Sequence, residues 1–137
     1  MDGLLLDGVS ILVVEDHTES RDAYALWLAQ QGAAITTASD AIDAHALLRN
    51  GLMPSLILTD LHMPGMDGDA FLSGVRQELH LSIPLVAITG DVMAAKQLSE
   101  AGFDACLVKP VQGRAVADVI ARVLGRTPDT ASEQPAR

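Results

Sequence analysis

The chain has 137 residues, of which 49% are hydrophobic and 3% aromatic, and its formal net charge is -9 at pH 7. This length predicts one domain with an aliphatic core, and the single cysteine excludes an internal disulfide and favours a reducing, cytoplasmic setting. The acidic balance argues against nucleic-acid binding, which needs clustered Lys and Arg, and the short apolar run in MDGLLLDGVS predicts neither a signal peptide nor a membrane span.

The first half of the chain alternates short apolar runs with segments of helical period. Residues 9–14 (VSILVV) form a nearly continuous apolar run and predict a strand. Residues 19–31 predict a helix, and residues 34–38 predict a second, weaker strand. Ser39 is the expected N-cap of another helix, which runs to Arg49.

The second half of the chain continues this alternation. The predicted elements are, in order, a strand over residues 55–59, a helix over 70–79, a strand over 85–89, a helix over 92–101, a strand over 106–108 and a last helix after Pro110. In the last helix the apolar residues recur at i, i+3, i+4, i+7 and i+8, namely Val116, Val119, Ile120, Val123 and Leu124.

Five strand-helix units predict a three-layer α/β sandwich. Continuous apolar strands are typical of a parallel sheet that is covered on both faces, and right-handed crossovers place helices on the two faces. We expect an N-terminal extension over residues 1–8 and one folded domain over residues 9–125. Residues 126–137 are polar and contain proline, which predicts a disordered tail or a linker.

Acidic, hydroxyl and basic residues follow the predicted strands at one edge of the sheet. Ligands bind parallel α/β sheets outside the carboxyl ends of the strands. The residues at these ends are Glu15 and Asp16, Thr59 and Asp60, Thr89, Gly90 and Asp91, and Lys109 and Pro110. Taken alone, Asp16 is as readily a helix N-cap as a residue of a binding site. Capping does not explain the whole set.

Carboxylates that lie a few ångströms apart raise one another's pKa, and either a proton or a bound cation relieves the repulsion. Mg²⁺ suits a site of oxygen ligands with one or two carboxylates and several waters. Together with Lys109, such an ion forms a pocket for a phosphoryl group, and a carboxylate such as Asp60 is able to attack it. Thr89 is able to donate a hydrogen bond to a phosphoryl oxygen, and Gly90 leaves room beside it.

Four motifs resemble the receiver domain of two-component response regulators. They are VVEDH at residues 13–17, LTDLHMPGMDG at 58–68, ITGD at 88–91 and LVKP at 107–110. Their order and spacing agree over residues 9–125, which makes the combined match far more specific than any single motif. The resemblance implies a flavodoxin-like fold, with a five-stranded parallel sheet of strand order 2-1-3-4-5 and five helices.

The resemblance also implies a role for each acidic residue. Asp60 would be the phosphoacceptor, and Asp16, Asp60 and the backbone carbonyl of His62 would bind Mg²⁺ directly, with Glu15 assisting through water. The side chains of His17 and His62 are expected to be exposed in loops, because hard ions prefer oxygen to imidazole. As a separate hypothesis, the His62 side chain tunes how fast water removes the phosphoryl group.

The remaining motif residues have implied roles around the phosphoryl group. Lys109 would pair with it, Thr89 would be the switch hydroxyl, and Gly90 would stand beside it. The bond before Pro110 is commonly cis in this family. Asp91, two places after Thr89, is a second candidate for tuning the rate of dephosphorylation.

The implied partners are proteins of a phosphorelay. A sensor or hybrid histidine kinase, or a histidine phosphotransfer protein, would dock near residues 18–27 and donate from a phosphohistidine. A downstream protein target would bind the face formed by residues 92–124. No nucleic-acid or membrane partner is expected. The chain would act as a signalling domain that catalyses only its own phosphorylation and dephosphorylation, either alone or as one module of a larger protein.

Cys106 lies three residues before Lys109, and a nearby cation favours a reactive thiolate. Strand alternation instead turns Cys106 to the face opposite Leu107 and Lys109. Receiver domains often carry Tyr or Phe at this position, where the ring swings inward when the switch hydroxyl moves. Cys106 therefore predicts intact phosphorylation chemistry with an altered or muted signal on the outer face.

Three other functions fit these residues less well. Haloacid-dehalogenase-like phosphohydrolases carry a second Asp two residues after the nucleophile, where this chain has His62. Flavodoxin-like nucleotide binders need a phosphate loop after the first strand, where this chain has Glu15 and Asp16. An interaction module that signals or scaffolds without phosphorylation is the remaining alternative, and the set of Asp60, Thr89 and Lys109 argues against it.

Overall fold

The computed structural model describes residues 4–61 and 68–126, and its centre is a five-stranded parallel sheet. The strands are β1 (Ser10–Val14), β2 (Ala34–Ala38), β3 (Leu56–Asp60), β4 (Leu85–Thr89) and β5 (Ala105–Val108). Their order is β2-β1-β3-β4-β5, which confirms the predicted fold class and strand order.

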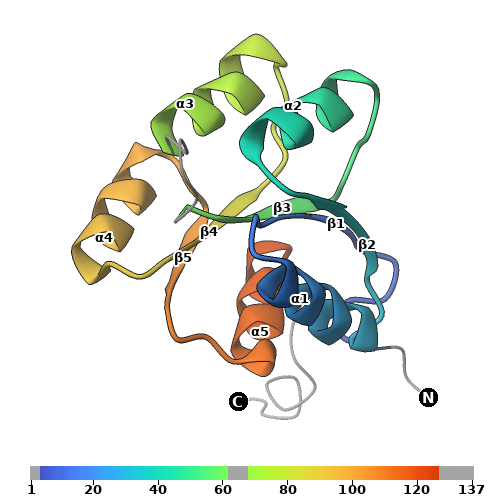
Figure 1. Ribbon diagram of the computed structural model, residues 1–137. Coiled ribbons are helices and arrows are strands. Elements are labelled where there is room, and N and C mark those ends of the chain that lie inside the picture. Colours follow the sequence, from blue (N-terminus) through green and yellow to red (C-terminus); the bar gives the residue numbers. More distant parts are fainter. Residues whose placement is uncertain (1–3, 62–67, 127–137) are drawn as a thin grey trace.

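Helices cover both faces of the sheet (Figure 1). They are α1 (Thr18–Gln30), α2 (Ala41–Arg49), α3 (Gly68–Ser73), α4 (Val92–Ala101) and α5 (Gly113–Val123). A π-helix over Gly74–Glu78 continues α3. Helices α1 and α5 cover one face, and α2, α3 and α4 cover the other, so the three predicted layers are present.

Strand alternation divides the apolar side chains between two cores. Ile11 and Val13 of β1 pack toward α1 and α5, whereas Leu12 and Val14 pack toward α2 and α3. The same alternation in β5 places Leu107 against the first core and leaves Cys106 against the second. Strands β3 and β4 are buried along their whole length, which explains why they are apolar up to the polar residues Thr59, Asp60 and Thr89 at their carboxyl ends.

The described part of the N-terminal extension is packed against this domain. Leu6 is fully buried in the first core, and its backbone N–H donates to the Gln31 carbonyl over 2.8 Å. Gly32 has a φ of +100°, and a Cβ there would lie 3.0 Å from the Asp7 backbone. Glycine is required at this turn because both its conformation and the close approach of the extension exclude a side chain.

Two local predictions were wrong in detail. Asp40, and not Ser39, caps α2, because its carboxylate accepts a hydrogen bond from the Asp43 backbone N–H over 2.7 Å. The third helix begins at Gly68, earlier than predicted, and ends in the π-helix. Across the described residues, no helix is both long and apolar enough to cross a membrane.

Candidate functional site

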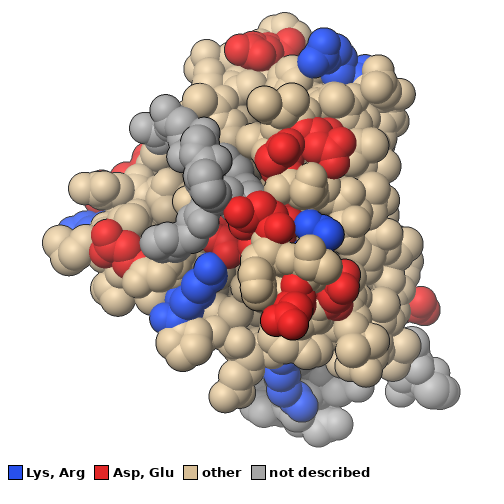
Figure 2. Space-filling view, viewed as in Figure 1, with Lys and Arg blue, Asp and Glu red and all other residues tan. Residues whose placement is uncertain are grey.

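The carboxyl ends of four strands place the polar residues at one edge of the sheet. Figure 2 shows acidic side chains gathered at the centre of this face, with basic side chains around them. Asp60 is the last residue of β3 and Thr89 is the last of β4, while Glu15 and Lys109 directly follow β1 and β5. The edge therefore brings together residues that are up to 94 positions apart in the sequence, from Glu15 to Lys109.

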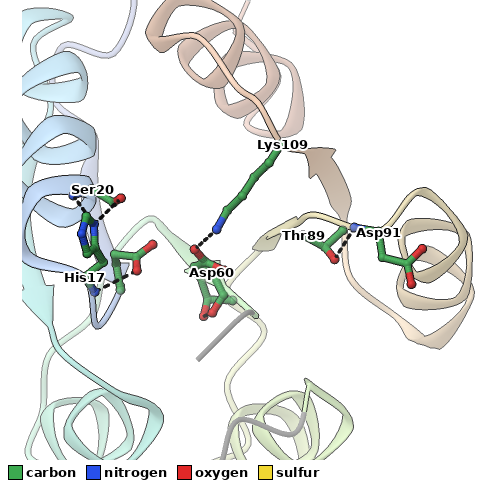
Figure 3. A network of polar contacts seen from close by, with 8 residues as sticks. His17, Ser20, Asp60, Thr89, Asp91 and Lys109 are labelled. Atoms are coloured by element: carbon green, nitrogen blue, oxygen red, sulfur yellow. Dashed lines mark hydrogen bonds and ion pairs between the residues drawn. The ribbon is translucent and has the colours of Figure 1, made fainter. Parts of the chain in front are cut away.

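Asp60 and Lys109 form the central ion pair of this edge (Figure 3). The Lys109 Nζ lies 2.6 Å from the Asp60 Oδ2, and the Asp60 side chain is 2% exposed. The Lys109 backbone N–H donates to the Thr89 carbonyl over 2.8 Å, which fixes the start of the lysine side chain. The Lys109–Pro110 peptide bond is cis. This ion pair thus joins a buried carboxylate to a partly exposed ammonium.

Glu15 is a second buried carboxyl beside this pair. Its Oε2 accepts a hydrogen bond from the His17 backbone N–H over 3.0 Å, and its buried Oε1 has no hydrogen-bond partner among the described residues. Burial first, and then the neighbouring Asp60 side chain and its charge, raise the pKa of Glu15 to about 8. The neighbouring Asp60 carboxyl thus raises a pKa at this edge, as the sequence predicted, although burial is the larger cause.

Asp16 lies next to Glu15 and is exposed, and it is not the N-cap of α1. The cap is His17, whose Nδ1 accepts a hydrogen bond from the Ser20 backbone N–H over 3.3 Å. The His17 ring is exposed, as expected. The capping alternative for Asp16 is therefore wrong, and its carboxylate stays at the edge of the site.

The donor set fits a hard cation that keeps several waters. Within residues 4–61 and 68–126, no three His, Cys, Asp or Glu side chains are grouped to hold a metal ion by themselves. His62 lies outside the described residues. The structure therefore tests neither its carbonyl as a metal ligand nor its side chain as a group that tunes the rate of dephosphorylation. Mg²⁺ accepts oxygen donors and few carboxylates, and the site offers both, together with a buried Glu15 oxygen that has no hydrogen-bond partner among the described residues.

Thr89 and Asp91 form a separate hydrogen-bonded pair, on the side of Asp60 that lies away from His17 (Figure 3). The Thr89 side chain is buried, and its Oγ1 accepts a hydrogen bond from the Asp91 backbone N–H over 3.2 Å. The Asp91 carboxylate accepts from the Met93 backbone N–H over 2.9 Å and so caps α4. Gly90, between them, is exposed and places no side chain at the site.

A groove of about 620 Å³ opens beside the ion pair, between α1 and the segment after β5. Its lining includes Ser20, Tyr24 and Trp27 from α1, and Gly90, Lys109 and Pro110 from the loops. The Tyr24 and Trp27 rings meet edge to face with centroids 5.6 Å apart. Lys109 therefore lies both at the buried carboxylate and in the wall of an open groove.

Cys106 is half-buried on the α4 side of the sheet. The Ser99 hydroxyl of α4 donates to its Sγ over 3.8 Å. Burial raises the pKa of the thiol, although the Ser99 hydrogen bond opposes this effect. Lys109 pairs with Asp60 instead of the thiol. This environment does not activate Cys106 as a nucleophile.

Sequence reasoning missed two residues of this site. The Arg21 Nη1 donates to the Glu15 carbonyl over 3.0 Å, and burial with the charges of Asp60 and Glu15 raises the pKa of Tyr24 to about 12. Arg21 lies in the first turns of α1, where side chains tilt toward the helix N-terminus and the preceding loop. No motif marks either position.

Comparisons with known proteins agree with the fold. The model of the response regulator receiver domain matches residues 11–121. The sensor histidine kinase RcsC of Salmonella typhimurium is 38% identical over 108 residues, which cover 77% of this chain and 11% of RcsC. The transcriptional regulatory protein AfsQ1 of Streptomyces coelicolor is 37% identical over 117 residues, which cover 85% of this chain and 52% of AfsQ1. The chain thus spans about half or less of the length of these relatives.

Solved structures give the same result. The chemotaxis response regulator CheY4 of Vibrio cholerae is 27% identical with a TM-score of 0.74, covering 84% of this chain and 98% of that one. The receiver domain of the sensor histidine kinase PA1611 from Pseudomonas aeruginosa is 24% identical with a TM-score of 0.74, covering 86% and 98%. In that structure a magnesium ion is coordinated in the active-site cleft.

Proposed function

Because the chain belongs to the response regulator receiver domain family, we propose that it accepts a phosphoryl group from a phosphohistidine onto Asp60 with Mg²⁺ and signals by a conformational change. The contact that carries this proposal is the 2.6 Å pair of the Asp60 carboxylate and the Lys109 ammonium. A buried carboxylate at the carboxyl end of a strand, paired with Lys109 beside an open groove, supports a role for Asp60 as the nucleophile toward an incoming phosphorus atom.

The proposed metal ligands are Asp16, Asp60 and the backbone carbonyl of His62, with Glu15 acting through water. When bound, Mg²⁺ neutralises phosphoryl oxygens and the crowded carboxylates. The Oε1 atom of Glu15, which has no hydrogen-bond partner among the described residues, supports an ion at this place.

The transfer makes one bond and breaks one bond. A carboxylate oxygen of Asp60 attacks the phosphorus, the P–N bond to the donor imidazole breaks, and its electron pair leaves with the imidazole nitrogen. Lys109 moves from the Asp60 Oδ2 to a phosphoryl oxygen and thereby keeps an anionic partner throughout. Attack of water on the aspartyl phosphate later returns inorganic phosphate and free Asp60.

The proposed signal begins at Thr89, whose buried hydroxyl turns to donate to a phosphoryl oxygen next to Gly90. The responding face comprises residues 92–124, where a downstream protein binds. Cys106 has no ring to follow the hydroxyl inward, so the response of β5 is expected to be muted. His62 and Asp91 are proposed to set the lifetime of the phosphoryl group.

The proposed phosphodonor is a sensor or hybrid histidine kinase, or a histidine phosphotransfer protein. It docks on α1, where the groove lined by Ser20, Tyr24 and Trp27 leads to Lys109. We assign residues 9–125 to the receiver domain, residues 1–8 to an extension and residues 126–137 to a tail or linker. The activity is placed in the cytoplasm, and no nucleic-acid contact is proposed because the net charge is -9.

The test is incubation with acetyl phosphate and Mg²⁺, followed by intact-mass measurement. One added phosphoryl group is expected, and it should be lost in Asp60→Asn and in excess EDTA. Asp118→Asn, which changes an acid of α5 that pairs with Arg114 and belongs to none of the four motifs, is the matched control and should be labelled normally. Equal labelling of the Asp60→Asn variant would overturn the proposal, and no labelling under any condition would favour an interaction module that works without phosphorylation.

A further inference from the structure

Arg21 of α1 binds the main chain that carries the acidic side chains. Its Nη1 donates a hydrogen bond to the Glu15 carbonyl oxygen over 3.0 Å. The Arg21 backbone N–H donates to the His17 carbonyl over 2.9 Å, and the His17 ring hydrogen-bonds to the Ser20 hydroxyl over 2.9 Å. Three contacts therefore tie the segment between β1 and α1 to the first turns of the helix.

The Arg21 guanidinium binds a carbonyl oxygen and leaves the carboxylates open. No acidic side chain of residues 4–61 or 68–126 lies within ion-pair distance of it. A guanidinium paired with Glu15 or Asp16 would compete with a metal ion for the same oxygens. Arg21 holds the main chain at Glu15 and does not bind the carboxylate oxygens themselves. Lys109, in contrast, pairs directly with the Asp60 carboxylate.

The segment that Arg21 holds carries a buried carboxylate oxygen that has no hydrogen-bond partner in the part of the chain that the structure describes. The Glu15 side chain is 2% exposed, and its Oε1 has no hydrogen-bond partner among the described residues, while Oε2 is held by the His17 backbone N–H. Buried polar atoms almost always have a partner, so an unpartnered one indicates a ligand or water that completes the site. The position of the main chain at Glu15 decides where this oxygen points.

We propose that Arg21 is a positioning residue that raises the affinity of this site for Mg²⁺ by holding Glu15 and Asp16 in place before the ion binds. The inference rests on the proposed function. Because the segment is already fixed, binding the ion does not have to restrict it. Loss of Arg21 therefore raises the Mg²⁺ concentration that the site needs and leaves the rate at saturating Mg²⁺ nearly unchanged.

The experiment measures Mg²⁺ binding to the full chain by calorimetry, with no phosphodonor present. Groups that orient metal ligands change affinity by about 10–100-fold, so Arg21→Gln is expected to weaken binding by about tenfold. Arg21→Lys should restore part of the loss, because an ammonium reaches the carbonyl with less preorganised geometry. Arg49→Gln is the matched control, since Arg49 contacts the His45 ring on α2 and should bind Mg²⁺ normally.

A second readout separates positioning from general stability. The half-saturating Mg²⁺ concentration for labelling by acetyl phosphate should rise by about tenfold in Arg21→Gln, with the maximal rate within about twofold of the parent protein. Unchanged Mg²⁺ affinity in Arg21→Gln would overturn the inference. Loss of folding in that variant, measured by circular dichroism, would assign Arg21 to stability and would overturn it as well. A parent protein that binds no Mg²⁺ would instead overturn the proposed function, before any variant is compared.

Discussion

Thr89 and Asp91 are joined by a hydrogen bond in which the Asp91 backbone N–H donates to the Thr89 hydroxyl oxygen over 3.2 Å. The Asp91 carboxylate in turn caps α4 through the Met93 backbone N–H. None of the ten residues of α4 is buried, and Val92 and Met93 are 69% and 74% exposed. One residue thus connects the proposed switch hydroxyl to the first turn of a helix that has no buried residue.

Replacement of Asp91 by Ala is expected to release the first turn of α4. Loss of an N-cap costs about 1 kcal/mol, which corresponds to about fivefold faster local hydrogen exchange at the Met93 amide. In the parent protein, beryllofluoride as a phosphoryl mimic should also change exchange at this amide, because Thr89 moves. The Asp91→Ala variant should lose most of that dependence. Hydrogen exchange followed by mass spectrometry or NMR measures both effects.

The matched control for this prediction is Asp40→Ala. Asp40 caps α2 in the same way, through the Asp43 backbone N–H at 2.7 Å, but it has no contact with Thr89. Its loss should speed exchange at the start of α2 and leave the beryllofluoride response of α4 intact. A normal response of α4 in Asp91→Ala would show that the signal reaches this helix by another route.

The stability of the metal-free protein should fall as the pH rises through the neutral range. In the unfolded chain Glu15 releases its proton near its ordinary pKa of 4.5, whereas in the folded chain it holds the proton up to a pKa of about 8. Between these values the folded state binds more protons, so the free energy of unfolding decreases with pH and then levels off above the folded pKa. Urea unfolding in EDTA at several pH values measures this slope, and Glu15→Gln should flatten it. An equal slope in both proteins would exclude Glu15 as its source.

The sequence predicted the parts of this protein that depend on periodic patterns. Apolar runs located all five strands, and the rule that ligands lie at the carboxyl ends of parallel strands brought Asp60 and Lys109 together. Individual hydrogen bonds were not predictable where several similar donors or acceptors lie within reach. Ser39 and Asp40 are both good capping residues, and only the tertiary structure selects the second. The contact of Arg21 with a carbonyl oxygen leaves no pattern in the sequence, because every residue offers a carbonyl.

Installing an aromatic ring at Cys106 should extend the conformational response to β5. Cys106 packs half-buried beside Ser99 of α4, and its thiol fills far less volume than a ring. In Cys106→Tyr, beryllofluoride should alter hydrogen exchange over Ala105–Val108, whereas the parent protein and Cys106→Ser should show little change there. Labelling of Asp60 should be normal in all three proteins. The same exchange pattern in Cys106→Tyr and in the parent protein would contradict a muted readout at this position.

Gly113, the first residue of α5, should not tolerate a side chain because Trp27 of α1 lies against it. A Cβ at Gly113 would lie 2.6 Å from the Cγ and Cδ2 atoms of the indole, so the ring would have to move. Gly113→Ala is expected to destabilise the protein by about 1–3 kcal/mol, and the displaced Trp27 should fluoresce at longer wavelength. Gly74→Ala is the matched control, because its Cβ would lie 3.3 Å from the His45 ring and requires only a small adjustment.

Adding Trp27→Leu to Gly113→Ala should recover stability relative to the sum of the two single changes. Additive effects in urea unfolding would show that this α1–α5 contact is not the source of the strain.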